Sequence, residues 1–243
     1  MRFLIVGVMM VAGMVAAGCQ EHSTVPARDF NELIPRLMKP VNTYDDPITA
    51  AANLFNVTSP DERRDAIAYL SPKPYGHEPA YMKAYYLLTT DPHAMVRAQA
   101  MRALGASHQQ EAVPYLINGN APSGATGVGK TGLSDPDVQV RRDAARGLME
   151  TFNDTAIPAV ADCLLKDTDD QVRVTCAQAL QNAHTPEAYR ALIGALDDRD
   201  AAVVYHAHLA LVANTGQDLG YNAKPWLEWH QKTYVKAATQ STP

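Results

Sequence analysis

The sequence is poor in aromatic residues, in cysteine and in positive charge. Phe, Trp and Tyr make up 7% of the 243 residues, and the formal net charge is −5. Few aromatics combined with alanine-rich segments favour closely packed helices over a β-sandwich. The negative charge argues against nucleic acid as a partner. No Ser/His/Asp or Cys/His arrangement is visible, so we expect no catalytic residues. The apolar fraction of 47% still suffices for an extended core.

One pattern of Asp, Val, Arg and small apolar residues recurs along the chain. Its clearest copy is residues 134–148, SDPDVQVRRDAARGL. In each copy, four apolar residues fall on one face of a helix. These faces are Val96, Ala100, Ala103 and Leu104; Val140, Ala144, Gly147 and Leu148; Val172, Cys176, Ala179 and Leu180; and Val203, Ala207, Ala210 and Leu211.

Polar residues recur in register with these faces. An aspartate stands five residues before each valine, where we expect it to cap the helix N-terminus. These aspartates are Asp91, Asp135, Asp167 and Asp198. Pro92 and Pro136 would then occupy the first helical position. An arginine follows the first three valines, whereas Val204 follows the last.

A fainter copy at residues 59–70 has Glu62 in place of the valine. The leucines that end the five copies are separated by 34, 44, 32 and 31 residues. These intervals fit a repeat of two helices, and the long one contains an inserted loop at residues 118–132.

The pattern D-P-x-x-x-V-R-x-x-A-A-x-A-L resembles the second helix of a HEAT repeat, over about residues 44–216. The resemblance implies an all-α fold, a right-handed α-α superhelix (solenoid) of about five HEAT-like helix pairs. Such arrays act as binding scaffolds and, more rarely, as enzymes.

The N-terminal residues predict export. Residues 1–18 read as a signal peptide, with Arg2 followed by an apolar run from Phe3 to Ala17. The sequence Ala-Ala-Gly-Cys ending at Cys19 resembles the bacterial lipobox, which implies acylation of Cys19. An ordinary cleaved signal and a retained anchor remain alternatives. Residues 19–43 would be a lipidated tether with a short helix. We expect anchoring to the cell membrane or outer membrane on the periplasmic side; Gln20 favours the outer membrane where the enterobacterial sorting rule holds.

Residues 217–243 leave the repeat and read as a C-terminal capping helix and tail. Trp226 and Trp229, at i and i+3, share a helix face. That face would cover the end of the array, with a ligand-stacking pair as the alternative.

The inserted loop contains a P-loop-like motif. Gly124, Gly129, Lys130 and Thr131 satisfy G-x-x-x-x-G-K-[ST]. A phosphate site also needs a helix that starts directly at the Lys-Thr pair, and here Gly132 to Pro136 follow instead. We therefore expect a flexible surface loop and no bound nucleotide.

The histidines and the remaining cysteines give no cofactor signal. His206 and His208 lie two residues apart, on different helix faces. His77-Glu78 is a single His-Glu dipeptide, whereas iron hydroxylases built from HEAT-like repeats use several. No metal or other cofactor is expected. Cys163 and Cys176 fall in the two helices of one repeat, as buried small hydrophobes or as a disulfide.

The predicted function is a membrane-anchored, non-enzymatic protein–protein interaction scaffold, whose partner would be another protein of the cell envelope. Residues two and six positions after each repeat valine would line the concave side of the array. Those predicted to contact the partner are Arg102, Arg142, Arg146, Val174, Gln178, Tyr205 and Leu209. The alternative is an enzyme on the same scaffold, such as a lyase resembling the phycobilin lyases. A deep polar pocket with clustered acid and tyrosine groups would favour the enzyme.

Overall fold

The computed structural model describes residues 46–119 and 131–235. All of them belong to the second of two compact units, which spans residues 44–243. Residues 1–45, with the predicted signal peptide, Cys19 and the tether, lie outside the described residues. Within the described ranges the secondary structure is helical, without strands. None of the described helices is long and apolar enough to span a membrane.

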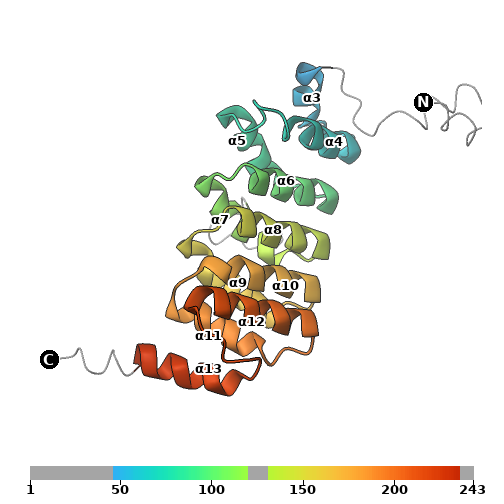
Figure 1. The fold of residues 1–243 in the computed structure, drawn as a ribbon. Coiled ribbons are helices and arrows are strands. Elements are labelled where there is room, and N and C mark those ends of the chain that lie inside the picture. Colours follow the sequence, from blue (N-terminus) through green and yellow to red (C-terminus); the bar gives the residue numbers. More distant parts are fainter. Residues whose placement is uncertain (1–45, 120–130, 236–243) are drawn as a thin grey trace, which may run out of the picture. The chain divides into compact units, whose positions relative to one another are not determined.

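Ten of the α-helices form five antiparallel pairs (Figure 1). The first helices of the pairs are α3 (Pro47–Asn53), α5 (Pro79–Leu88), α7 (Val113–Asn118), α9 (Ile157–Lys166) and α11 (Pro186–Ala195). The second helices are α4 (Pro60–Leu70), α6 (Ala94–Ala106), α8 (Val138–Glu150), α10 (Asp170–Ala179) and α12 (Ala201–Thr215). A final helix, α13 (Ala223–His230), continues into a π-helical turn, Gln231–Val235. The predicted all-α solenoid of about five helix pairs is confirmed.

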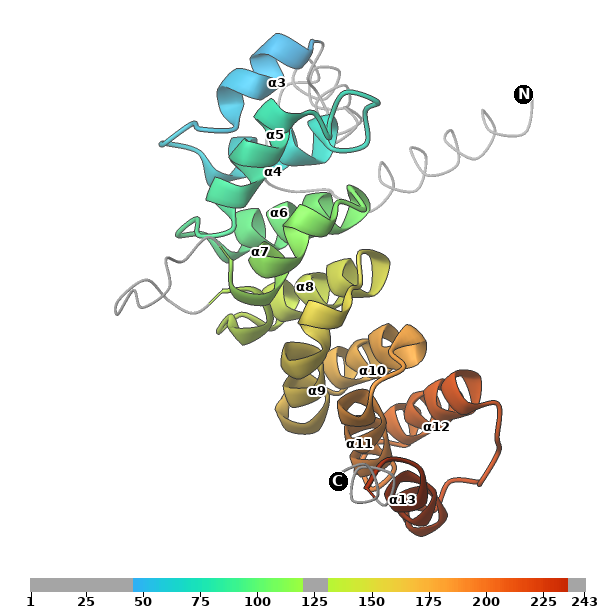
Figure 2. The ribbon, with the colours of Figure 1, turned by 90° about the vertical axis from the view of Figure 1, so that its left-hand side faces the viewer.

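The helices stack in two layers, which Figures 1 and 2 show from two sides. We call α4, α6, α8, α10 and α12 the second-helix layer, and each of them packs against the next. We call α3, α5, α7, α9 and α11 the first-helix layer. The apolar faces predicted from the repeat lie in the core between the layers. All of their residues are buried, as the helical period predicted.

The helix starts differ from the prediction. The aspartates five residues before each valine are not N-caps. The caps of α8, α10 and α12 are Asp137, Asp169 and Asp200, whose carboxylates accept from first-turn amides. The predicted caps Asp91, Asp135, Asp167 and Asp198 lie two residues earlier and accept from the amide of the residue at the cap position, at 2.8–2.9 Å. Each forms a turn that leads into its helix.

The prolines shift with them. Pro92 and Pro136 lie in these turns, ahead of α6 and α8, and not at the first helical position. Pro47 and Pro60, by contrast, do occupy the first turns of α3 and α4.

Helices α6 and α8 approach closely because two glycines face each other. A Cβ added at Gly105 would lie 2.5 Å from the Cα of Gly147. A Cβ at Gly147 would in turn lie 2.7 Å from Cδ2 of Leu116. The third repeat therefore depends on glycine at position 147, where the three other clear copies carry alanine and the fainter copy carries Tyr69.

Two glycines with positive φ bring the ends of the inserted loop together. Gly119 has φ 64° and Gly132 has φ 66°. Between them, the Thr131 hydroxyl donates to the Asn118 carbonyl at 3.0 Å. Of the P-loop-like motif, Thr131 is described and buried, and Gly124, Gly129 and Lys130 lie outside the described residues. The residues after Thr131 form a single 3-10 turn, Gly132–Ser134, and the next α-helix begins at Val138.

Candidate interaction surface

A chain of ion pairs joins each repeat to the next; the pair Arg63–Asp91 is buried and the other three are partly buried. The arginine after the repeat valine donates two hydrogen bonds, from Nε and Nη2, to the aspartate that precedes the following second helix. The four pairs are Arg63–Asp91 at 2.7 and 2.9 Å, Arg97–Asp135 at 2.7 and 2.8 Å, Arg141–Asp167 at 2.8 and 3.0 Å, and Arg173–Asp198 at 2.8 and 2.9 Å. The bidentate geometry matches the planar guanidinium to the carboxylate and makes these hydrogen bonds strong. We call this set the Arg–Asp ladder.

The remaining guanidinium nitrogen, Nη1, connects successive Arg–Asp pairs of the ladder. Nη1 of Arg97, Arg141 and Arg173 donates to the carbonyl of the preceding ladder aspartate, at 2.9–3.0 Å. Each arginine therefore binds the backbone of its own repeat and the carboxylate of the next one. The ladder ends at Asp198, because Val204 occupies the arginine position in the last repeat.

The pKa values of the rungs follow from these contacts. The hydrogen bonds to Asp135, Asp167 and Asp198 raise the pKa of Arg97, Arg141 and Arg173. At Asp198, burial opposes ionisation, but the hydrogen bonds from Arg173 and the Asp200 amide prevail and lower its pKa. The ladder charges thus compensate each other within the array.

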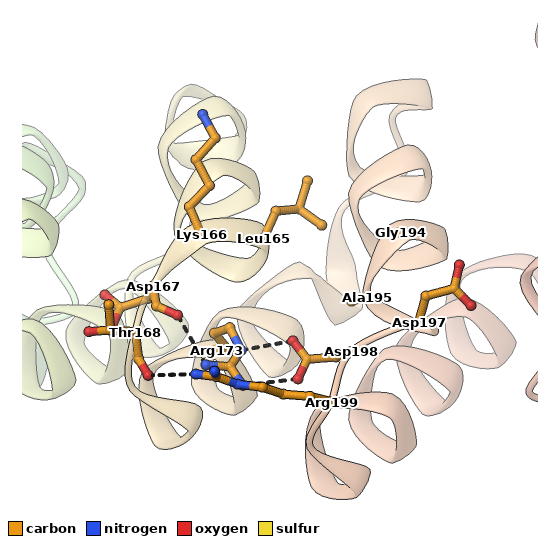
Figure 3. A pocket seen from close by; sticks show the side chains of 10 residues that line it. All are labelled: Leu165, Lys166, Asp167, Thr168, Arg173, Gly194, Ala195, Asp197, Asp198 and Arg199. Atoms are coloured by element: carbon orange, nitrogen blue, oxygen red, sulfur yellow. Dashed lines mark hydrogen bonds and ion pairs between the residues drawn. The ribbon is translucent and has the colours of Figure 1, made fainter.

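Two hollows lie along the ladder. One, of about 460 Å³, lies between the fourth and fifth repeats, beside Leu165, Arg173 and Asp198 (Figure 3). The other, of about 530 Å³, contains Arg141 and shares Thr168 with the first. In Figure 3, Arg173 reaches Asp198 and the Asp167 carbonyl, and Arg199 donates to the Thr168 carbonyl at 3.2 Å. These groups bind one another, and no tyrosine lines either hollow. The arrangement lacks the convergent acid and tyrosine groups that would favour an enzyme.

Three of the predicted partner-binding residues bind aspartates: Arg102 and Arg146 bind Asp143, and Arg142 binds Asp169. Asp143, on α8, receives Arg102 from α6 at 2.9 Å and Arg146 from α8 at 3.7 Å. Its carboxylate is completely buried, and Gln139 donates to it at 2.9 Å. Arg142 instead binds Asp169, the cap of α10, at 2.6 Å. The hydrogen bond from Arg142 lowers the pKa of Asp169.

The remaining predicted residues lie toward the C-terminal end of the layer. Val174 is buried, with 8% of its surface exposed. Gln178 hydrogen-bonds the ring of His206 on α12 at 3.3 Å. Tyr205 and Leu209 on α12 are exposed, at 48% and 39%. The arginines predicted to contact a partner are therefore paired with aspartates, whereas Tyr205 and Leu209 are open to solvent.

The histidines and cysteines are placed apart from any candidate cofactor site. Within the part of the chain that the structure describes, no three His, Cys, Asp or Glu residues gather in a way that could hold a metal ion. His208 binds Asp218 at 2.8 Å, whereas His206 contacts Gln178. Cys163 and Cys176 are buried free thiols. A hydrogen bond with Cys163 and complete burial raise the pKa of the Cys176 thiol.

The final helix packs against α11. Trp226 is fully buried and donates from Nε1 to the Gly220 carbonyl at 2.7 Å. Trp229 meets the ring of Tyr189 edge-on, with the ring centroids 5.3 Å apart. Asn222 caps the helix by accepting a hydrogen bond from the Lys224 amide. Both tryptophans are thus engaged within the fold.

Comparisons with known proteins agree with this architecture. The sequence profile of HEAT repeats matches residues 130–213, and that of the PBS lyase HEAT-like repeat matches residues 96–119. The chain therefore contains HEAT repeats. No curated protein matches the chain in sequence.

The fold matches 21 chains of solved structures, of which two are described. One is the complex of CpcE and CpcF of phycocyanin lyase from Nostoc sp. PCC7120, at 21% identity and a TM-score of 0.58, with 92% of this chain and 77% of that chain covered. The other is an engineered protein, at 21% identity and a TM-score of 0.50, with 82% of this chain and 91% of that chain covered. At this identity the likeness shows the fold alone.

Proposed function

We propose that this chain is a non-enzymatic interaction scaffold of the cell envelope, held to a membrane by a lipid on Cys19 and binding another protein through its second-helix layer. The observation that carries the proposal is the set of exposed Arg, Tyr and Leu side chains along that layer. Arg146, Tyr205 and Leu209 are exposed on a rigid support of stacked helices. Arg and Tyr are the residues that most often dominate binding energy at interfaces.

Support for a scaffold rather than an enzyme comes from how the polar groups are used. The ladder arginines and aspartates compensate each other, and Asp143 and Asp169 take up Arg102 and Arg142. Polar groups that hold repeats together preserve the shape of a binding surface.

The test is affinity capture with crosslinking from membranes of the source organism. Tyr205→Ala and Arg146→Gln should each reduce recovery of the partner, while helicity and melting temperature stay unchanged. Arg146 suits this test better than Arg142, because its side chain is 59% exposed and its ion pair with Asp143 is long, at 3.7 Å, whereas Arg142 binds the cap of α10 at 2.6 Å. Arg190→Gln, an exposed arginine of the first-helix layer, is the matched control. Recovery at wild-type level from both test variants would place the binding site elsewhere.

A second candidate is an enzyme on this scaffold. The observation that favours it is the likeness to the phycocyanin lyase complex. A lyase of that kind would attach chromophore to phycocyanin, so incubation of the chain with apo-phycocyanin and bilin is a direct assay. Chromophore attachment above the rate without protein would favour the enzyme over the scaffold.

A further inference from the structure

Helix α12 has no charged residue. Its 15 residues, AAVVYHAHLALVANT, are mostly apolar, and the ones that remain exposed include Ala202, Tyr205, Leu209 and Ala213. These four lie three or four residues apart and therefore form one stripe along the helix. An apolar stripe along a helix is normally packed against another part of the fold. Here the stripe faces solvent.

The earlier repeats show what residues at the positions of Tyr205 and Leu209 contact. Three residues at two or six positions after the repeat valine contact the next second helix or its cap, whereas Arg146 binds Asp143 of its own helix. Arg142 binds the cap of α10, Arg102 binds Asp143 of α8, and Gln178 binds His206 of α12. Tyr205 and Leu209 hold these two positions on α12. They therefore occupy the face that elsewhere contacts the following repeat.

The segments after α12 cover only part of this face. Asp218 hydrogen-bonds His208, and the Tyr221 ring lies 4.1 Å from the ring of His208, between centroids. Helix α13 packs against α11, in the other layer. Among the described residues, Tyr205 and Leu209 therefore stay about half exposed, whereas Val174, at the position of Tyr205 in the preceding repeat, is buried.

We propose that this face binds one amphipathic helix of a partner protein, which extends the second-helix layer as a sixth second helix would. The proposal rests on the scaffold function proposed above and specifies its site and its partner. The partner's docking face should carry small and apolar side chains without charge. With Val204 in place of the ladder arginine, α12 offers no ionic partner there, and an unpaired charge buried against it would be costly. Helix-in-groove recognition of this kind reads apolar anchors at helical spacing.

A second copy of this chain is a poorer occupant. To continue the layer head to tail, it would present α4, the first second helix of the array. The position of α4 that corresponds to Asp143 and His206 is Asp65, which is paired with Arg64 at 2.8 Å. Arg64 also binds Asp61 at 2.8 Å. These charged side chains, which are 25–74% exposed, would lose water against a stripe whose one polar side-chain group is the Tyr205 hydroxyl.

The experiment places a photo-crosslinking amino acid at position 209 of the full chain, in cells of the source organism. The matched control carries it at position 87, because Leu87 is also an exposed leucine, at 54% against 39% for Leu209, and lies in the first-helix layer. We expect position 209 to crosslink to a helix of another protein, and position 87 not to do so. A peptide with the crosslinked sequence should then bind the purified chain. Leu209→Gln, which restores the residue type of Gln178, should weaken that binding about tenfold or more, and Leu87→Gln should leave it unchanged.

Several outcomes would overturn the inference. They are a crosslink from position 209 to a second copy, a crosslink equal to that from position 87, the absence of any crosslink, and peptide binding that survives Leu209→Gln. Circular dichroism and melting of Leu209→Gln check that the variant is folded. The wider proposal fails separately. If partner capture is lost in Arg146→Gln but kept in Leu209→Gln, the scaffold function stands and this docking site does not.

Discussion

Removal of Arg173 should test whether the Arg–Asp ladder stabilises the array. Its side chain is the least exposed of the ladder arginines, at 3%, and it donates to Asp198 and to the Asp167 carbonyl. Arg173→Met keeps much of the apolar stem but leaves the half-buried Asp198 carboxylate with the Asp200 amide as its remaining short hydrogen bond. Breaking a buried pair by removing one partner costs about 3–5 kcal/mol. We expect a loss in that range at pH 7.

Urea unfolding followed by circular dichroism measures this loss, and heating gives a second estimate. For a domain of this size, about 1 kcal/mol corresponds to roughly 2–4 °C in Tm. Exposed Arg190→Met is the control and should change stability by less than about 0.5 kcal/mol. The double variant Arg173→Met with Asp198→Asn removes the stranded charge and keeps an acceptor for the Asp200 amide. It should therefore be more stable than Arg173→Met alone.

The pH dependence gives an independent check. Asp198 has a lowered pKa in the folded chain. Its contribution is therefore complete above the unfolded pKa, near 3.8, and is lost as the pH falls through the folded pKa. The difference in stability between wild type and Arg173→Met should shrink below about pH 4. If Arg173→Met costs no more than Arg190→Met, or if the difference does not depend on pH, the ladder does not stabilise the array in this way.

Three further predictions concern other parts of the chain. Cys19→Ser should move the protein from the membrane to the soluble fraction on cell fractionation; unchanged retention would rule out lipid anchoring. Lys130→Ala should leave the stability unaltered, and calorimetry should detect no ATP binding to either the wild type or the variant. Saturable ATP binding that the variant loses would restore the P-loop interpretation. Gly105→Ala should cost about 1–3 kcal/mol in denaturant unfolding, because its Cβ would meet the Gly147 backbone at 2.5 Å. Gly194→Ala is the control, since its nearest contact is a flexible leucine side chain; an equal cost would refute the packing argument.

The buried faces could be predicted from the sequence because they depend only on helical period. Val140, Ala144 and Leu148 recur with the spacing of one helix face, and the same face is buried in every copy. The number of helix pairs followed from the same repeat. Nothing beyond the chain's own register was needed for these predictions.

The ladder could not be read in the same way, although its residues were visible. Each arginine binds an aspartate 25 to 38 residues ahead, so the contact depends on how one repeat stacks on the next. The constant positions of Arg and Asp around the valine were the signal, and the aspartates were assigned to capping instead. Capping explains a lone aspartate before a helix equally well. In three of the four turns the second aspartate, Asp137, Asp169 or Asp200, is the cap and the first binds an arginine, whereas the cap residue of α6 is His93.

The arginines predicted to contact a partner also show that contacts between repeats are hard to predict from the sequence. Arg102 and Arg142 read as free charges along one strip, because their partners Asp143 and Asp169 lie in the next repeat. The helical period predicts which side chains lie along one side of the array, but not that aspartates of the next repeat neutralise the arginines among them. Helix α12 is the last second helix among the described residues. At its positions two and six residues after the repeat valine, Tyr205 and Leu209 meet no following repeat and remain exposed.

Helix α12, as the second helix of the terminal repeat, has to meet two requirements. An arginine at position 204 would have no following aspartate to bind, so a valine there avoids an unpaired charge at the end of the ladder. The same reasoning would place polar residues at 205 and 209, since a terminal repeat needs a polar outer face for solubility. The sequence has tyrosine and leucine instead. If these residues served only the fold, Leu209→Gln should be neutral in every assay. If they serve binding, it should be neutral in stability, within about 0.5 kcal/mol, and defective in binding alone. Loss of stability together with binding would instead assign Leu209 to the fold.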